Sequence, residues 1–111
     1  MATTVTHYRD VVVLTVKDDM SSDAVAAFSE KARRAVETGG RQIVVDCTNV
    51  RCFDSAGLEA LVDLQTQCEE HLGAVKLCGL DETCAKTLEI TRLARRFEMF
   101  EDMDAAVKSF S

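Results

Sequence analysis

The chain has 111 residues, of which 47% are hydrophobic and 29% charged, and this is enough to bury a core without disulfides or a metal. Its 13 basic and 19 acidic side chains leave a formal net charge of −6, which disfavours direct binding to nucleic acid and to anionic membranes. No apolar run approaches the roughly 20 residues of a membrane-spanning helix, and the N-terminus lacks a signal-peptide pattern. We expect a cytoplasmic protein, without membrane insertion, that forms a single domain over residues 1–111.

Strands and helices are predicted to alternate after an N-terminal hairpin. Runs of β-branched and other apolar residues indicate strands, and apolar residues at three- and four-residue spacing indicate helices. The expected strands cover residues 5–8, 11–16, 41–46 and 74–78. The expected helices cover residues 23–38, 58–71, 82–90 and 102–110. Residues 97–100 fit either a short strand or a turn that packs into the core. This order predicts an α/β sheet with parallel crossovers after the hairpin.

The helix predicted at residues 58–71 is amphipathic, and Gly73 is expected to end it. Its outer face carries Glu59, Asp63, Gln67 and Glu70. The side chains expected to pack inward are Leu58, Leu61, Val62, Leu64, Cys68 and Leu72.

The cysteines argue against a disulfide framework and against a zinc site. Their number is odd, no pair has the C-x-x-C spacing, and neither His7 nor His71 lies at ligand spacing to a cysteine. We interpret them as small buried thiols in a reducing compartment. They are Cys47, Cys52, Cys68, Cys78 and Cys84.

Three acidic residues, Asp18, Asp19 and Asp23, cluster before the first helix. A calcium loop would need more oxygen ligands and usually a glycine turn. We interpret the cluster as a solvated helix start, at which Ser21 or Ser22 caps the helix. The sequence predicts neither a metal site nor a cofactor.

The segment 54–58, Asp-Ser-Ala-Gly-Leu, lies where the loop after a predicted strand meets a helix. Unpaired N–H groups at a helix start would stabilise a phosphate on Ser55. The alternative is that Asp54 or Ser55 simply caps the helix. Gly57 costs roughly 1 kcal/mol of helix propensity relative to alanine, which indicates that another backbone or a partner comes close. Phe53 is expected to bury its ring, so that the loop presents Ser55 outward.

A catalytic role for Ser55 is disfavoured. The chain has no G-x-S-x-G elbow. His71 lies about four turns along the helix, roughly 24 Å at 1.5 Å per residue, and cannot serve as a base. The other histidine, His7, lies on the first strand. We therefore expect a non-catalytic binding module and not an enzyme.

The segment 53–58, Phe-Asp-Ser-Ala-Gly-Leu, resembles the Asp-Ser-x-Gly-Leu motif of the STAS domain, the family of bacterial anti-sigma factor antagonists. The resemblance covers essentially the whole chain, and residues 88–97 look like that family's Leu-Phe-Asp-x-Thr-Gly-Leu segment. It implies a STAS-like fold, in which the N-terminal β-hairpin joins a mixed sheet of four to five strands. About four helices would pack mainly on one side of that sheet.

The resemblance also implies a partner-switching role. The unphosphorylated antagonist binds an anti-sigma factor that is also a serine kinase; the kinase phosphorylates the serine after the motif aspartate, and the complex dissociates. A metal-dependent serine phosphatase reverses the modification. The implied acceptor in this chain is Ser55, and Ala56 removes the second acceptor that the family often has. The implied partner-binding residues are Asp19, Ser21, Ser22, Phe53, Asp54, Ala56 and Gly57.

A second reading of the same motif stays open. The Ser-Ala-Gly sequence at 55–57 also looks like STAS subunits attached to phospholipid-trafficking ABC transporters. That resemblance implies a scaffold that binds the transporter's ATPase through the same edge and does not require phosphorylation.

Overall fold

The secondary structure follows the predicted alternation. The computed structural model describes residues 3–17, 19–20 and 22–110, with the side chains of Ser22 and Asp23 outside that description. The strands are β1 (Thr3–Tyr8), β2 (Val11–Val16), β3 (Gln42–Asp46), β4 (Ala74–Cys78) and β5 (Glu98–Phe100). The helices are α1 (Ser22–Glu37), α2 (Ser55–Glu70), α3 (Glu82–Ile90), the 3-10 helix η1 (Leu93–Arg96) and α4 (Met103–Lys108). The segment 97–100 therefore contributes a strand.

The strands of the described residues form one mixed sheet in the order β1-β2-β3-β4-β5. β1 runs antiparallel to β2, and Tyr8 pairs with Val11 across the Arg9-Asp10 turn. The pairs β2–β3, β3–β4 and β4–β5 are parallel. This confirms the predicted α/β fold and its mixed sheet. Because parallel strands point the same way, the loops after β2 and β3 leave the sheet at the same edge.

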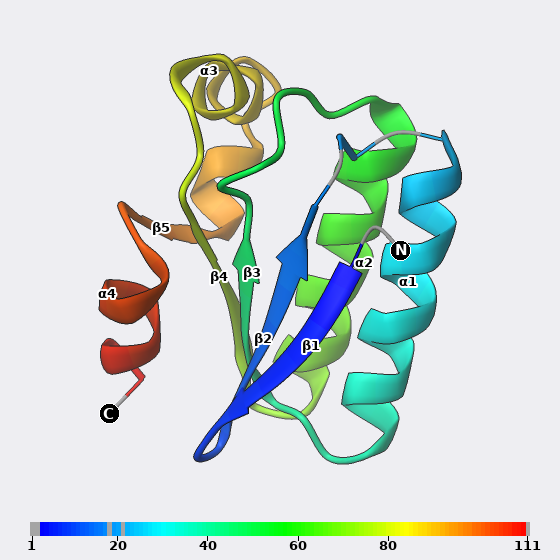
Figure 1. The fold of residues 1–111 in the computed structure, drawn as a ribbon, viewed down its shortest axis with the longest axis vertical. Helices are drawn as coiled ribbons and strands as arrows, with labels where there is room; N and C mark the ends of the chain where they lie inside the picture. Colours follow the sequence, from blue (N-terminus) through cyan, green and yellow to red (C-terminus); the bar gives the residue numbers. More distant parts are fainter. Residues whose placement is uncertain (1–2, 18, 21, 111) are drawn as a thin grey trace.

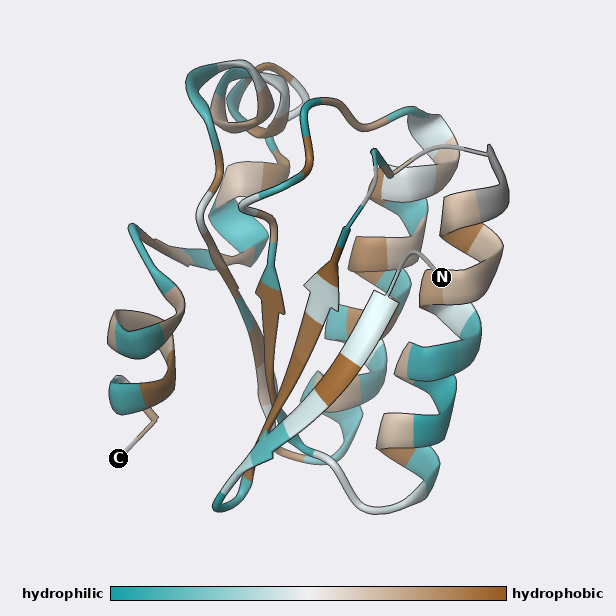
Figure 2. Ribbon diagram, viewed as in Figure 1, coloured by the Kyte–Doolittle hydropathy of each residue, from teal (hydrophilic) through white to brown (hydrophobic). Residues whose placement is uncertain are grey.

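Helices cover the two faces of the sheet unequally (Figure 1). α1 and α2 lie side by side on one face, where they enclose the larger core together with residues of α3, while α4 packs on the other face. Figure 2 shows the hydrophobic strands running between these layers. Each large side chain that is fully buried contributes about 1.5–3 kcal/mol to stability. In the larger core these side chains include Leu14, Met20, Phe28, Ile43, Leu61, Leu77 and Leu88.

Two side chains that we expect inside the protein are exposed, and the prediction is wrong for both. α2 ends at Glu70, and Leu72 has a φ of 64° that takes it off the helical path, so Leu72 is 96% exposed. Cys52 lies in the loop after β3, in which Val50 and Phe53 take the inward positions. The other four cysteines are buried as predicted.

A buried glutamine fixes α2 against the sheet. Gln65 is 5% exposed, and its Oε1 accepts a hydrogen bond from the backbone N–H of Val75 at 2.7 Å. Its Nε2 donates to the backbone carbonyl of Arg96. The Arg96 guanidinium in turn forms a 3.0 Å ion pair with Glu69 of α2. These links set the position of α2, and with it the position of the helix N-terminus.

Candidate functional site

Two loops meet beside the start of α2. Met20, in the loop after β2, forms an isolated parallel bridge with Phe53, in the loop after β3. The N–H of Met20 donates to the carbonyl of Cys52 at 3.1 Å, and the N–H of Asp54 donates to the carbonyl of Met20 at 3.1 Å. The Met20 side chain is fully buried, and Phe53 is only 9% exposed. The loop that leads to Ser55 is therefore fastened by backbone hydrogen bonds and by the core.

Asp19 adds a further link between the same two loops. Its carboxylate accepts a hydrogen bond from the backbone N–H of Arg51 at 2.8 Å. Asp19 is half-buried, so one part of the residue supports the loop while another part remains accessible. The sequence resemblance placed Asp19 at the partner surface, and the structure brings it to the loop that carries Phe53 and Asp54.

Gly57 packs against the backbone of Met20. A Cβ atom on Gly57 would overlap the Met20 carbonyl oxygen and would lie 2.9 Å from the Met20 Cβ. A side chain at this position is therefore excluded, and the helix keeps a glycine in its first turn despite the cost in helix propensity. Of the two alternatives predicted for Gly57, another backbone or a partner, the structure shows the backbone of Met20 in close contact.

Asp54, and not Ser55, caps α2. Asp54 has an extended backbone, and its Oδ1 accepts a hydrogen bond from the N–H of Gly57 at 2.8 Å. The helix begins at Ser55 instead of the predicted Leu58, because the cap adds residues that carry no apolar periodicity. Ser55 is exposed, and no hydrogen bond joins its hydroxyl to another residue that the structure describes. The Ser55 hydroxyl is thus presented to solvent.

Two opposing charges act on the position of Ser55. The N-terminus of α2 carries a partial positive charge, which stabilises an exposed anion by about 0.3–1 kcal/mol. The first turn of α2 contains no acidic residue. The carboxylate of Asp54, which precedes the helix, acts in the opposite sense on any added anion. A phosphate at Ser55 would therefore change the free energy of folding little.

The remaining residues of the implied partner surface divide into exposed and buried ones. Ala56 is exposed next to the serine, whereas Phe53 and Gly57 are buried below the surface. Ser21 lies outside the described residues, and so does the side chain of Ser22, whose backbone begins α1.

The described side chains around Ser55 provide little acid–base chemistry. His71 caps the opposite end of α2, a helix of 16 residues, at roughly 24 Å. Partial desolvation and the Asp19 carboxylate raise the pKa of the Cys52 thiol, which keeps it protonated near neutral pH. Within the described residues, no group of three or more His, Cys, Asp or Glu side chains is placed to hold a metal ion.

No helix among the residues that the structure describes is long and apolar enough to cross a membrane.

Met20 is the site residue that sequence reasoning missed. It lies in a polar connection between β2 and α1, and its side chain is fully buried. The available signal is a single large apolar residue among charged and small polar neighbours, which indicates a loop anchored to the core.

A family model of the STAS domain matches residues 2–106. The chain therefore belongs to the STAS domain family, as the motif at residues 54–58 indicated. Among curated proteins, no sequence matches this one.

Solved structures with the same arrangement cover nearly the whole chain. The protein TM1081 from Thermotoga maritima superposes with a TM-score of 0.90 at 18% identity, covering 96% of this chain and 92% of that one. An anti-sigma-factor antagonist (STAS) domain protein from Planctomyces limnophilus gives 0.87 at 20% identity, with 100% and 99% covered. The phosphorylated form of the Bacillus cell fate determinant SpoIIAA gives 0.78 at 18% identity, with 99% and 100% covered. At these identities the likeness establishes the fold.

We expect Gly57→Ala to destabilise the protein although alanine is the better helix former. Overpacking typically costs about 1–3 kcal/mol, and the methyl group would overlap a backbone carbonyl that cannot swing away. Urea unfolding followed by circular dichroism measures the change, with the exposed neighbour variant Ser55→Ala as the control. A Gly57→Ala protein at least as stable as the wild type would contradict the close contact with Met20.

We expect Asp54→Ala to lower the free energy of unfolding by about 1 kcal/mol, because the N–H of Gly57 loses its acceptor. Asp54→Asn retains a side-chain oxygen and should recover most of the loss. Ser55→Ala should have almost no effect, and scanning calorimetry measures all three variants. Equal losses for Asp54→Ala and Ser55→Ala would show that the serine shares the capping role.

Proposed function

We propose that this protein is a partner-switching regulator controlled by phosphorylation of Ser55. In the unphosphorylated form it binds an anti-sigma factor that is also a serine kinase, and a sigma factor is set free. Phosphorylation of Ser55 ends the complex, and a metal-dependent serine phosphatase restores the binding form. The protein itself catalyses no step of this cycle. The observation that carries the proposal is the exposed hydroxyl of Ser55 at a helix N-terminus whose cap is already supplied by Asp54.

The proposed partner surface has an exposed layer and a supporting layer. Ser55 and Ala56 form its centre, with Asp54 exposed next to them and Asp19 in the adjoining loop. The buried residues of the motif keep this surface in shape through their contacts with Met20. A phosphate in the centre would have to lose its water when a partner packs against it. That desolvation is costly unless cations on the partner compensate for it.

Membership in the STAS family and the likeness to SpoIIAA in its phosphorylated form support the proposal by analogy. The analogy concerns the fold and the location of the motif. The role of Ser55 in this chain rests on its own exposure and on its place at the start of α2.

Phosphorylation is expected at Ser55 alone. The purified protein should gain the mass of one phosphate when incubated with its cognate serine kinase and with ATP, and peptide mapping should place that phosphate on Ser55. Ser55→Ala should abolish the reaction. Ser29→Ala, which removes another exposed serine from α1, should leave it unchanged. A phosphate on any other residue, with a kinase of verified activity, would overturn the assignment.

A negative charge at position 55 is expected to weaken partner binding without unfolding the protein. Ser55→Asp should lower the affinity for the kinase partner at least tenfold, which corresponds to about 1.4 kcal/mol, because the charge must be desolvated in the interface. Ser55→Asn has nearly the same shape and is the neutral control. Both variants should melt within a few degrees of the wild type, as measured by calorimetry.

Equal binding by Ser55→Asp and Ser55→Asn would count against the switch. If, in addition, the partner captured from cells were the ATPase of a membrane transporter, the two results together would favour the alternative that the protein is a transporter subunit.

A further inference from the structure

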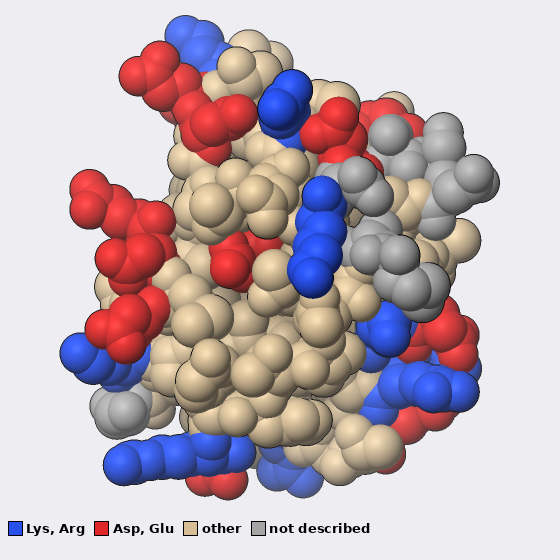
Figure 3. All heavy atoms as spheres, viewed as in Figure 1, with Lys and Arg blue, Asp and Glu red and all other residues tan. Residues whose placement is uncertain are grey.

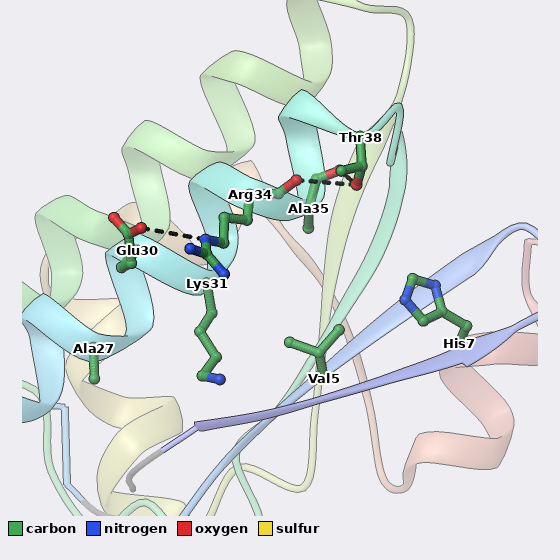
Figure 4. Close-up of a pocket in the computed structure, with 8 residues that line it drawn as sticks. All are labelled: Val5, His7, Ala27, Glu30, Lys31, Arg34, Ala35 and Thr38. Atoms are coloured by element: carbon green, nitrogen blue, oxygen red, sulfur yellow. Dashed lines mark hydrogen bonds and ion pairs between the residues drawn. The ribbon is translucent and has the colours of Figure 1, made fainter.

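A groove runs between β1 and α1 at the edge of the sheet (Figure 4). It has a volume of about 440 Å³, and Val5, Ala27 and Ala35 give it an apolar lining. Lys31 extends from α1 toward β1, and the ring of His7 rises from β1 toward the helix. The groove thus combines a hydrophobic floor with basic side chains from both of its walls.

A second groove of about 570 Å³ adjoins the first and shares His7 with it. Arg9 of the hairpin turn, Arg41 before β3 and Leu72 after α2 line it. Leu72 is the 96% exposed residue, and its φ of 64° is a conformation that residues other than glycine rarely adopt. An exposed leucine held in this way offers an apolar contact next to two arginines.

The charge of these grooves contrasts with that of the whole chain. The acidic residues of the grooves are Glu30, which is already bound by Arg33 at 2.8 Å and by Arg34 at 3.4 Å, and Asp10, which lies in the hairpin turn next to Arg9. The basic residues Lys31, Arg9 and Arg41 take part in none of the ion pairs among the described residues. Figure 3 shows Lys and Arg along the lower and right edges of the molecule, with Asp and Glu between them, whereas Asp and Glu dominate its left side. A local positive potential on a chain of net charge −6 favours an anionic ligand at this end.

The strand that forms one wall of the first groove has an open edge. β1 is the terminal strand of the sheet, and β2 is its neighbour. In an antiparallel hairpin closed by the pair Tyr8–Val11, the backbone N–H and C=O groups of Val5 and His7 point away from the partner strand. Val5 is 37% exposed and His7 is exposed, and no Lys, Arg, Asp or Glu lies between Thr3 and Tyr8 to protect this edge.

We propose that this face binds an extended acidic segment of a partner protein by strand addition to β1. Backbone groups of the segment would pair with those of Val5 and His7. Its side chains on one face, alternately spaced, would place carboxylates near Lys31 and small apolar groups over the floor. The row of backbone groups that no other described strand pairs with distinguishes this partner from a lipid or a free anion, which would use the cations but not the strand edge.

The proposed face is separate from Ser55. None of the residues that line the two grooves belongs to the segment 53–58. Leu72, in the second groove, follows the end of α2 opposite to Ser55, and the 16 residues of that helix span roughly 24 Å. The acidic segment would therefore bind equally well to wild-type protein and to Ser55→Asp. This independence also keeps the test of the groove distinct from the test of the phosphorylation switch.

The test uses fluorescence anisotropy and a fluorescein-labelled peptide of about eight residues, Glu-Thr-Val-Thr-Glu-Thr-Val-Thr, which is typical of one strand and places Glu and Val in turn on the same face. The wild type should bind the peptide with a dissociation constant below roughly 1 mM. Lys31→Glu should weaken binding roughly five- to tenfold, because it replaces an attraction by a repulsion. Lys86→Glu is the matched control, since it makes the same charge change on an exposed residue of α3 and should have little effect. Circular dichroism verifies that both variants are folded.

A second arm examines the backbone pairing without changing the protein. The same peptide with alternate N-methylated amides keeps its charge but cannot add to a strand edge, and it should lose at least tenfold in affinity. Equal binding of the methylated peptide, equal losses in Lys31→Glu and Lys86→Glu, or no binding by the wild type would each overturn the proposal. Displacement of the peptide from the protein by phosphatidylglycerol vesicles of equal total charge would also overturn the proposal, because that result would indicate that the face binds an anionic lipid surface.

Discussion

The backbone contact between Met20 and the start of α2 is the constraint on which the site depends. The Met20 carbonyl accepts a hydrogen bond from the N–H of Asp54 at 3.1 Å, and it occupies the space that a side chain on Gly57 would need. Two loops from neighbouring strands are thereby held in register although neither has regular structure. The fixed position of the two loops favours binding. A partner that meets a preformed surface does not have to immobilise a loop, so the complex forms without that loss of conformational entropy.

The electrostatics of Ser55 explain how one modification can act on a complex and spare the fold. In the free protein a phosphate would gain about 0.3–1 kcal/mol from the helix N-terminus, and the nearby Asp54 would oppose that gain. At a packed interface the same group would have to be desolvated, which costs several kcal/mol per ion when no counter-charge is supplied. The difference between these two magnitudes provides the proposed switch. It requires a solvent-facing hydroxyl, and the capping role of Asp54 leaves the hydroxyl of Ser55 in that position.

The bounds of a helix or strand could be predicted where they depend on the local sequence pattern. They could not be predicted where they depend on a contact with a residue far away in the sequence. β2 and α3 match their predicted bounds because β-branched runs and apolar spacing determine them residue by residue. The sequence pattern predicts a start of α2 at Leu58, later than the observed Ser55, since the first turn depends on a cap and on the distant Met20. Leu72 continues the apolar spacing of the helix, but the backbone turns before it can pack. At the site, the serine and the close approach to Gly57 were predictable from local features, whereas the anchoring role of Met20 was not.

A contact of the same kind fixes the opposite end of α2. A Cβ on Gly73 would overlap the carbonyl of Arg41, which also accepts a hydrogen bond from the N–H of Ala74 at 2.9 Å. Because both ends of the helix rest on backbone, α2 has no loose end that a charge on Ser55 could displace toward the groove beside β1. We therefore expect the two proposed surfaces to act independently, so that one partner could be held at the sheet edge while another is exchanged at the helix start.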